Sequence, residues 1–322
     1  MKGFVHQALI YDSDEEFMDV VMPFIEEGVI AKEPTLVAVQ ERHVENLRAA
    51  LGGAPAGVTL FSTEQWYDTS ARTREKYARW VAENTNGSDK DHRRMDTRAR
   101  LVGEPPWAIG HEAQVRDWAR YESVLNVAFA GYPVTLICPY DASALPADII
   151  RHARSTHPEI VDAEETMPSE SYEDPVEFCR RLDSFVSPPP GVPDAEISFG
   201  LADLPAVRRT IGSLTIDAGL VRTKADEMVL AVNEIATNAV VHGRSPAALR
   251  IWRTGGEIIF EVSDSGEGIK DVLAGQLTPD VAGPGGRGLW LTRLVADAVE
   301  IRNGTGCTVT IHAAAPVLSV AG

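Results

Sequence analysis

The sequence has few cysteines, no long apolar run and no cluster of basic residues. Its three cysteines, Cys138, Cys179 and Cys307, lack the paired spacing of a zinc site, and an odd number favours reduced thiols over a disulfide framework. The most apolar region, residues 124–138, is interrupted by polar residues, glycine and proline, and is shorter than the roughly 18 residues that a membrane-spanning helix needs. We therefore expect neither disulfides nor a membrane anchor.

The charge balance argues against nucleic acid as a partner. The formal net charge is -17, and no run of lysine and arginine compensates it, so a polyphosphate backbone would be repelled. The first residues, MKGFVHQALIYDSDEEF, do not follow the pattern of a secretion signal. We expect a cytoplasmic protein.

The length and one proline-rich segment predict two domains. A chain of 322 residues is long for a single compact core, and SPPPGVPD at residues 187–194 disfavours both helix and strand. We expect an N-terminal domain at residues 1–185, a linker at 186–195 and a C-terminal domain at 196–322.

The two predicted domains differ in their order of elements. Upstream of the linker, short apolar runs such as PTLVAVQ and VTLICPYD alternate with helical patterns, which is typical of an α/β domain with a mostly parallel sheet. Downstream, two helical segments precede two adjacent strand patterns, and a loop, a helix and a final strand pair follow. This order predicts an α+β sandwich with helices on one face of a mixed, mainly antiparallel sheet.

Polar side chains recur along the second downstream helix. Glu234, Asn238 and His242 are spaced by four residues and therefore project from nearly one helix face, although an exposed polar face would show the same spacing. The strand IIFEVSD then leads into Asp264 and two glycines, Gly266 and Gly268. An aspartate at a strand end can accept a hydrogen bond from an amino group, and glycines let a planar base approach the backbone, but DxGxG is also an ordinary turn.

A glycine-rich segment, GPGGRG at residues 283–288, leads into the last helical pattern. Free backbone N–H groups and the positive end of a helix dipole suit a polyphosphate, and Arg287 adds a permanent cation. Alone, such a segment is more often a flexible connection. Its position after the other two motifs gives it weight.

These three motifs, EIATNAVVHG, DSGEG and GPGGRGLWL, resemble those of the Bergerat (GHKL) ATP-binding superfamily over about residues 194–312. Within it, DLPAVRRTIGSL before the motifs and GGRGLWLTRLVAD after them are most similar to the anti-sigma-factor serine kinases. The resemblance implies that the domain binds ATP with Mg²⁺.

The resemblance also implies roles for individual residues. Asn238 would hold Mg²⁺ against the phosphates, Asp264 would read adenine, and Glu234 would be the general base that accepts a proton from an attacking hydroxyl. His242 would contact phosphate or cap the helix. The other implied cofactor-binding residues are Gly266, Gly268, Gly285, Gly286, Arg287 and Gly288.

One position departs from the superfamily pattern. A threonine often follows the glycine of the last strand pair and supports the adenine-binding aspartate, but here Gly306 is followed by Cys307. Thr308 or a water molecule would have to take that role. The effect of Cys307 on ATP affinity stays open.

Residues from about Phe4 to Val161 resemble the MEDS (methanogen/methylotroph) sensory domain. The motifs are HQALIYDSDEEF, RARLVGEPPW, WARYESVLN, LICPYD and THP. The resemblance implies a RecA-like, mostly parallel α/β fold, and the chain contains no GxxxxGK[ST] phosphate loop. The domain would bind an unknown small molecule.

Several polar and aromatic residues of this domain are candidates for a sensory pocket. They equally fit structural roles in the core, for instance Glu122 as the partner of Arg98 or Arg100. A metal site made of His6, Cys138 and His157 is disfavoured, because these residues come from scattered elements without metal-type spacing. The candidates are His6, Trp107, Glu122, Asn126, Cys138, Tyr140 and Asp141.

Together the two resemblances imply a signalling switch: an anti-sigma-factor-type serine/threonine protein kinase regulated by a sensory domain. Its partners would be a sigma factor, a serine-containing anti-sigma antagonist, or both, and a homodimer is left open. The alternative is a non-catalytic ATP-binding module that captures a partner. A sensor histidine kinase is a weaker alternative, because no histidine outside the helix at 223–242 lies in an H-E/D-x-x-x-P signature.

Overall fold

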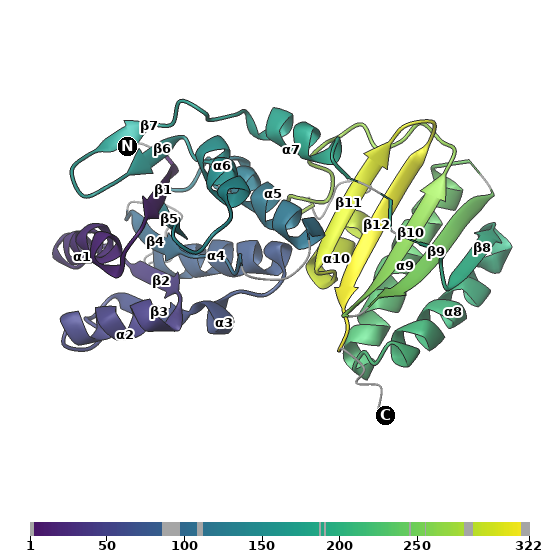
Figure 1. The fold of residues 1–322 in the computed structure, drawn as a ribbon, viewed down its shortest axis with the longest axis horizontal. Helices are drawn as coiled ribbons and strands as arrows, with labels where there is room; N and C mark the ends of the chain where they lie inside the picture. Colours follow the sequence, from purple (N-terminus) through teal and green to yellow (C-terminus); the bar gives the residue numbers. More distant parts are fainter. Residues whose placement is uncertain are drawn as a thin grey trace, which may run out of the picture. The chain divides into compact units, whose positions relative to one another are not determined.

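The computed structural model describes residues 3–85, 97–107, 112–186, 188–189, 191–244, 246–254, 256–279 and 286–316. The chain divides into two units: the first covers most of the chain up to Phe178, and the second covers the chain from Cys179 onward together with two short upstream segments, Thr69–Ala71 and His111–Asp117 (Figure 1). In the described residues between Asp183 and Ala195 there is no helix or strand. No helix of the described part is both long and apolar enough to cross a membrane.

The N-terminal domain is built on a seven-stranded sheet in the order β3-β2-β4-β5-β1-β6-β7. All neighbouring strands are parallel except β6 and β7. The predicted mostly parallel α/β fold is therefore confirmed. The strands are β1 (Val5–Tyr11), β2 (Thr35–Val39), β3 (Val58–Ser62), β4 (Ala99–Gly103), β5 (Val134–Asp141), β6 (Glu159–Val161) and β7 (Thr166–Pro168).

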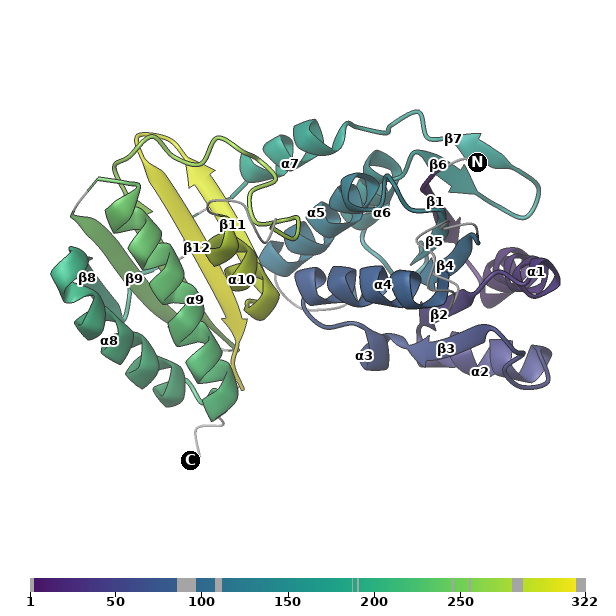
Figure 2. The same cartoon turned by 180° about the vertical axis from the view of Figure 1, so that it is seen from behind.

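Helices cover both faces of this sheet. Figures 1 and 2 show α1 and α2 on one side of the strands and α4, α5 and α6 on the other. Ser13 is the N-cap of α1, and its side-chain oxygen accepts a hydrogen bond from the Glu16 backbone N–H. The helices are α1 (Asp14–Ala31), α2 (Glu41–Ala50), α3 (Thr63–Trp66), α4 (Ser70–Thr85), α5 (Glu112–Ala128), α6 (Ala147–Thr156) and α7 (Pro175–Asp183).

Strand alternation separates two layers of side chains in this domain. Leu9 of β1 and Ile137 of β5 belong to a core that also contains Phe17 and Val21 of α1. Because successive side chains of a strand point to opposite faces, Cys138 lies on the other side of the sheet from Ile137. The carboxyl ends of the parallel strands meet at one edge, where open α/β sheets usually bind ligands.

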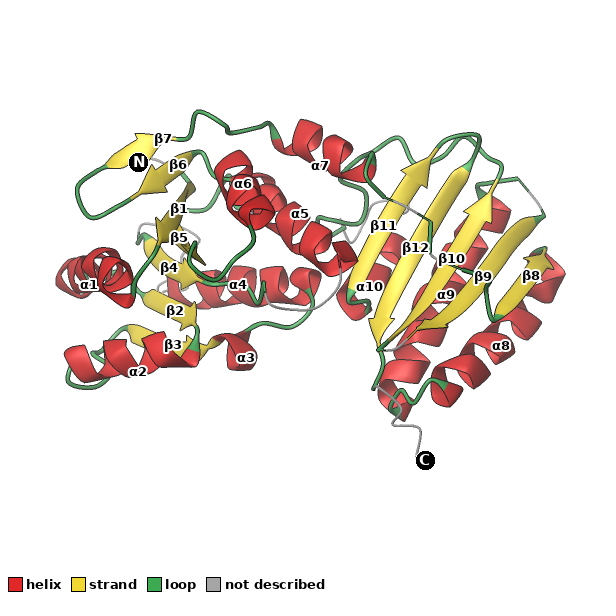
Figure 3. Cartoon of the chain, viewed as in Figure 1, coloured by secondary structure: helices red, strands yellow, loops and turns green. Residues whose placement is uncertain are grey.

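The C-terminal domain has a five-stranded antiparallel sheet in the order β11-β12-β10-β9-β8, with α8, α9 and α10 on one face (Figures 2 and 3). This confirms the α+β fold expected from the sequence. The edge strand β8, which precedes the helices, was not predicted. The elements are β8 (Ala195–Phe199), a 3₁₀ turn (Leu201–Asp203), α8 (Leu204–Asp217), α9 (Arg222–Val241), β9 (Ala247–Thr254), β10 (Glu257–Asp264), α10 (Arg287–Val295), β11 (Ala298–Asn303) and β12 (Cys307–Ala314).

The helix α9 shows how this fold positions polar groups. Met228, Val232, Ile235 and Ala239 recur every three or four residues, are buried, and belong to the core shared with the sheet. An apolar face of this kind fixes the rotation of the helix. Polar residues next to that face therefore have a defined direction.

Candidate functional site

A cavity of about 590 Å³ lies in the C-terminal domain, in the region of α9, the end of β10 and the start of α10. Most residues that the sequence assigned to nucleotide binding line it. Gly266 and Thr308 are not among the described residues that line it, and Gly285 lies outside the described residues. The assigned residues in the lining are Glu234, Asn238, His242, Asp264, Gly268, Gly286, Arg287 and Gly288.

Asp264 is held in place by its neighbours. Its Oδ1 accepts a hydrogen bond from the Gly266 backbone N–H at 2.7 Å. A Cβ at Gly243 would lie 2.4 Å from the Asp264 carboxyl carbon, so only glycine fits at that position. Among the described residues nothing donates to Asp264 Oδ2, and the carboxylate keeps an acceptor for a ligand. The sequence analysis assigned no role to Gly243, although it is the last residue of the EIATNAVVHG motif.

The backbone after Asp264 follows a path that requires glycine. Gly268 has a φ of 79°, and a Cβ there would lie 2.4 Å from Asn303 Oδ1. Asn303 also holds the next residue: its Oδ1 accepts from the Ile269 N–H at 3.0 Å and its Nδ2 donates to the Ile269 carbonyl at 2.9 Å. These contacts shape one wall of the cavity.

Glu234 and Asn238 lie next to the start of α10. A Cβ at Gly288 would be 3.0 Å from Glu234 Oε2 and 3.2 Å from Asn238 Nδ2, so the absence of a side chain leaves both groups their space. Gly286, with a φ of 80°, is the N-cap of α10. The helix therefore presents backbone N–H groups close to a carboxylate and an amide.

Cys307 faces the cavity, whereas Thr308 does not line it. Cys307 and Val309 both belong to the lining, and alternation along β12 turns the residue between them to the other face. Cys307 is paired with Asp264 across the strands. Burial and the negative charge of Asp264 raise the pKa of the Cys307 thiol to about 11, so it is a neutral thiol at physiological pH.

In the N-terminal domain, four of the predicted sensory residues lie together on the side of the sheet covered by α5 and α6. Glu122 Oε2 is 3.3 Å from His6 Nε2 and 3.5 Å from Cys138 Sγ. Asn126 Oδ1 lies 3.2 Å from His6 Nδ1. His157, which the sequence analysis named only for the disfavoured metal site, joins them with its Nε2 at 3.5 Å from Glu122 Oε2.

Burial and the interactions among these side chains together set the protonation of this cluster. Burial and the neighbouring His157 lower the pKa of His6 to about 4. Burial raises the pKa of Glu122, but the influence of the two neighbouring histidines outweighs burial and lowers that pKa to about 2. Burial and Glu122 raise the pKa of the Cys138 thiol. At neutral pH, Glu122 is thus a carboxylate beside the uncharged imidazole of His6 and an uncharged thiol.

Tyr140 and Trp107 lie near the cluster, and Asp141 does not belong to it. The Tyr140 ring is 5.5 Å from that of Trp107 and 5.6 Å from that of His157, between centroids. Arg100, one suggested partner of Glu122, instead pairs with Glu33 at 2.6 Å. Asp141 is the last residue of β5 and belongs to a second polar network.

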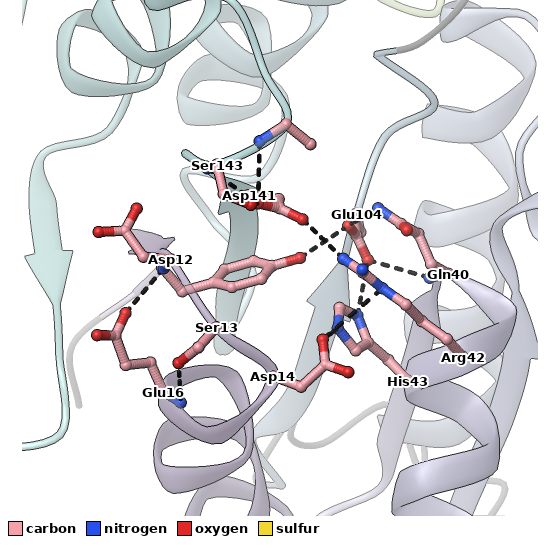
Figure 4. Close-up of polar contacts among 12 residues, drawn as sticks. Asp12, Ser13, Asp14, Glu16, Gln40, Arg42, His43, Glu104, Asp141 and Ser143 are labelled. Carbon is pink, nitrogen blue, oxygen red and sulfur yellow. Dashed lines mark hydrogen bonds and ion pairs between the residues drawn. The ribbon is translucent and has the colours of Figure 1, made fainter.

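This second network lies at the carboxyl ends of the parallel strands (Figure 4). Glu104, directly after β4, accepts hydrogen bonds from the backbone and side chain of Gln40, and from the Tyr11 hydroxyl at 3.3 Å. Arg42 donates from Nη2 to Asp141 Oδ2 at 2.7 Å. The sequence analysis missed both residues, although Glu104 directly follows the apolar strand β4 and Arg42 is the second residue of α2.

The comparisons with known proteins match a different family in each part of the chain. The family described as MEDS, the methanogen/methylotroph, DcmR sensory domain, matches residues 5–158, and the family described as histidine kinase-like ATPase domain matches residues 197–312. None of the curated proteins matches the chain.

Among solved structures, the chain is similar to the RsbU and RsbW domains of Rv1364c from Mycobacterium tuberculosis. The identity is 19% and the TM-score 0.28, and the match covers 40% of this chain and 35% of that one. A likeness of this size adds nothing to the fold described above. The two family matches do: the chain carries a MEDS domain in its N-terminal part and a histidine kinase-like ATPase domain in its C-terminal part.

Proposed function

We propose that the C-terminal domain is an Mg²⁺- and ATP-dependent serine/threonine protein kinase of the anti-sigma-factor type, regulated by the MEDS domain. The observation that carries the proposal is the position of Glu234. Its carboxylate lies beside Asn238 and beside the start of α10, in the same cavity as Asp264. A pocket that only binds nucleotide does not need a base at that position.

Different residues of the cavity would bind the adenine, the Mg²⁺ ion and the phosphates. Asp264 accepts the adenine amino group, while Gly268 lets the base approach the backbone. Asn238 would hold Mg²⁺, which neutralises phosphate charge when bound. Arg287 and the N-terminal end of α10 attract the phosphates.

Glu234 acts on the protein substrate. The oxygen of a serine or threonine hydroxyl attacks the γ-phosphorus of ATP, the bond to the bridging oxygen breaks, and ADP leaves. Glu234 accepts the hydroxyl proton. The substrate we propose is a serine-containing antagonist protein, and the partner whose activity is switched is a sigma factor.

The MEDS domain would supply the input. Glu104, Arg42 and Asp141 gather hydrogen-bonding groups at the carboxyl ends of the strands, which suits a small polar molecule. Binding there would bias ATP binding or transfer in the second domain. The process takes place in the cytoplasm.

Glu234→Gln tests the proposal. The glutamine keeps the size of the side chain but cannot accept the proton, so ATP should still bind while phosphorylation of a partner falls by about 10²- to 10⁴-fold. Parent and variant are incubated with γ-labelled ATP and extract of the native cell, and label on serine or threonine is measured. Glu227→Gln, on the same helix but outside the cavity lining, is the control and should behave like the parent.

Two outcomes contradict the kinase. Equal labelling by parent and Glu234→Gln would show that Glu234 is not the base. A partner that binds in an ATP-dependent way but receives no label from the parent would favour the non-catalytic partner-capture module.

A further inference from the structure

Four potential metal ligands of the MEDS domain converge although they come from four elements. His6 lies on β1, Glu122 on α5 and Cys138 on β5, and His157 is the C-cap of α6. One ligand atom from each side chain lies within 4.8 Å of every other. The four residues are 0–2% exposed. We call them the His6 cluster.

The spacing of the ligand atoms is that of a tetrahedral site. Glu122 Oε2 is 3.3 Å from His6 Nε2 and 3.5 Å from both Cys138 Sγ and His157 Nε2, and Cys138 Sγ is 3.5 Å from His6 Nε2. Bonds of about 2.0–2.3 Å to a central zinc ion place tetrahedral ligands about 3.3–3.6 Å apart. Four of the six ligand pairs therefore already have the separation that zinc requires.

The outer nitrogen of each histidine fixes which nitrogen faces the cluster. His157 Nδ1 lies 2.8 Å from the Ala153 carbonyl oxygen, which can only accept, so Nδ1 carries the hydrogen. His6 Nδ1 lies 3.2 Å from Asn126 Oδ1. The orientation of the Asn126 amide is fixed, because its Nδ2 donates hydrogen bonds to the Ser123 and Thr156 carbonyls that a flipped amide would lose. Asn126 Oδ1 therefore faces His6, and His6 Nδ1 carries the hydrogen.

In a neutral imidazole with hydrogen on Nδ1, Nε2 carries a lone pair. Both Nε2 lone pairs then point toward the Glu122 carboxylate, and three acceptors meet in a buried space where the weak S–H donor of Cys138, 3.5 Å from Glu122 Oε2, can satisfy only one of them. His157 Nε2 and Glu122 Oε1 have no hydrogen-bond partner among the described residues. Buried acceptors facing one another cost free energy unless a cation lies between them.

We propose that His6 Nε2, Glu122, Cys138 Sγ and His157 Nε2 bind a divalent transition-metal ion, with zinc as the ion that fits best. Two imidazoles, a carboxylate and a thiolate are zinc ligands, and hydrogen bonds from the outer histidine nitrogens are typical around bound zinc. On binding, the Cys138 thiol loses its proton to solvent. The +2 ion then balances one carboxylate and one thiolate, so the filled site has no net charge in the domain interior.

The four protein ligands leave no position for a substrate. The ion therefore ties β1, β5, α5 and α6 together instead of catalysing a reaction. It joins residues as distant in sequence as His6 and His157. This role is independent of the kinase activity proposed for the other domain.

Metal content and spectra of the full-length chain test the site. After removal of metal with a chelator, the parent should bind one Zn²⁺ per chain and unfold at a higher temperature with zinc than without it. Cobalt in place of zinc should show the thiolate charge-transfer absorption and the intense visible bands of tetrahedral Co²⁺. Cys138→Ser should lose the charge-transfer band, and His157→Asn should lose at least about tenfold in zinc affinity.

The control is Cys179→Ser, which removes another buried cysteine outside the His6 cluster. It should keep one zinc per chain and the cobalt spectrum of the parent. If a variant of the cluster does not fold, the cobalt spectrum of the parent still decides the matter. A parent without thiolate charge transfer, or zinc binding that Cys138→Ser leaves unchanged, would overturn the proposal.

Discussion

Two buried clusters of histidine and glutamate, one in each domain, differ in the number of carboxylates for each imidazole. In the C-terminal domain His312 lies between two, with Nδ1 at 3.1 Å from Glu257 Oε2 and Nε2 at 3.4 Å from Glu300 Oε2. In the N-terminal domain a single carboxylate, Glu122, is shared by His6 and His157. The C-terminal cluster therefore has two carboxylates for one imidazole, whereas the N-terminal cluster has one carboxylate for two imidazoles.

The ratio of carboxylates to imidazoles decides what balances the negative charge of each cluster. Burial lowers the pKa of His312, but Glu257 and Glu300 outweigh it and raise the pKa to about 9, so a proton compensates the carboxylates. Burial lowers the pKa of His6 to about 4, so its imidazole is uncharged at neutral pH. A buried cluster of uncharged imidazoles around a carboxylate is suited to a metal ion. A protonated histidine between two carboxylates forms structural ion pairs instead.

The ATPase cavity differs from both clusters because it is large and open to a ligand. Its volume is about 590 Å³, and its glycines keep the space next to Glu234 and Asp264 clear. The His6 cluster instead brings its ligand atoms within 4.8 Å of one another, which leaves room for an ion alone. The predictions below separate these three arrangements.

The largest effect is expected from Asn238→Ala. If Asn238 holds the metal in the cavity, its loss should abolish Mg²⁺-dependent ATP binding, a fall of more than about 100-fold by calorimetry. Asn233→Ala, on the same helix, removes a partly exposed amide that accepts from Arg208 and should bind ATP like the parent. Zinc binding at the His6 cluster should be unchanged in both variants. Full Mg-ATP affinity in folded Asn238→Ala would remove this residue from the site.

The next effect concerns His312 and pH. A raised folded pKa means that the stabilisation is complete below the unfolded value near 6.5 and is lost as pH rises through about 9. The C-terminal domain should therefore lose roughly 2–3 kcal/mol over this range. Hydrogen exchange of β10 and β12, measured at both ends of the range, reports the free energy of opening.

His312→Gln should remove this part of the pH dependence. His242→Gln, in the same domain, is the control and should keep it. An unchanged pH dependence in His312→Gln would show that the carboxylates do not hold a proton there, and the contrast with His6 would fail.

A smaller loss is expected from Gly268→Ala. An L-residue at a φ of 79° costs roughly 1–2 kcal/mol, and the new Cβ would meet Asn303. ATP affinity should fall by about 5- to 30-fold as the wall of the cavity shifts. Gly304→Ala, where no atom lies near the new Cβ and φ is not positive, should leave ATP binding intact. If Gly268→Ala and Gly304→Ala bound ATP with equal affinity, the loop at Gly268 would not be part of the nucleotide site.

The smallest effect is base selection. If Asp264 accepts from the adenine amino group, guanine would place a carbonyl oxygen at that position, and an unpaired buried acceptor costs about 1–3 kcal/mol. The parent should thus prefer ATP over GTP by about tenfold in competition against a fluorescent ATP analogue. Asp264→Asn, which can also donate, should weaken ATP and narrow the preference. Equal binding of GTP by the parent would refute this role of Asp264.

The amino-acid sequence predicted both fold classes, because each depends on local patterns. Apolar runs marked four of the parallel strands, and the apolar spacing of α9 fixed which of its residues face the core. The three nucleotide motifs stand in a fixed order along the chain. The roles of Glu234, Asn238 and Asp264 follow from their resemblance and stay predictions.

Local patterns did not reveal the short edge strand β8 or the side of β12 that faces the cavity. β8 has only five residues, and its pairing with β9 is not encoded in a motif. Thr308 and Cys307 are neighbours in sequence, so only the register of β12 against β10 shows that the cysteine faces the cavity.

Tertiary structure alone decided which distant polar residues meet. The sequence analysis disfavoured a metal site of His6, Cys138 and His157 for want of spacing, and it grouped Asp141 with the sensory candidates, whereas the structure pairs Asp141 with Arg42. The pairing of β5 with β1 brings Cys138 next to His6, and the α6 C-cap adds His157. Such contacts depend on strand order, which hydrophobic periodicity does not contain, because periodicity records the face a residue occupies but not the strand that will lie beside it.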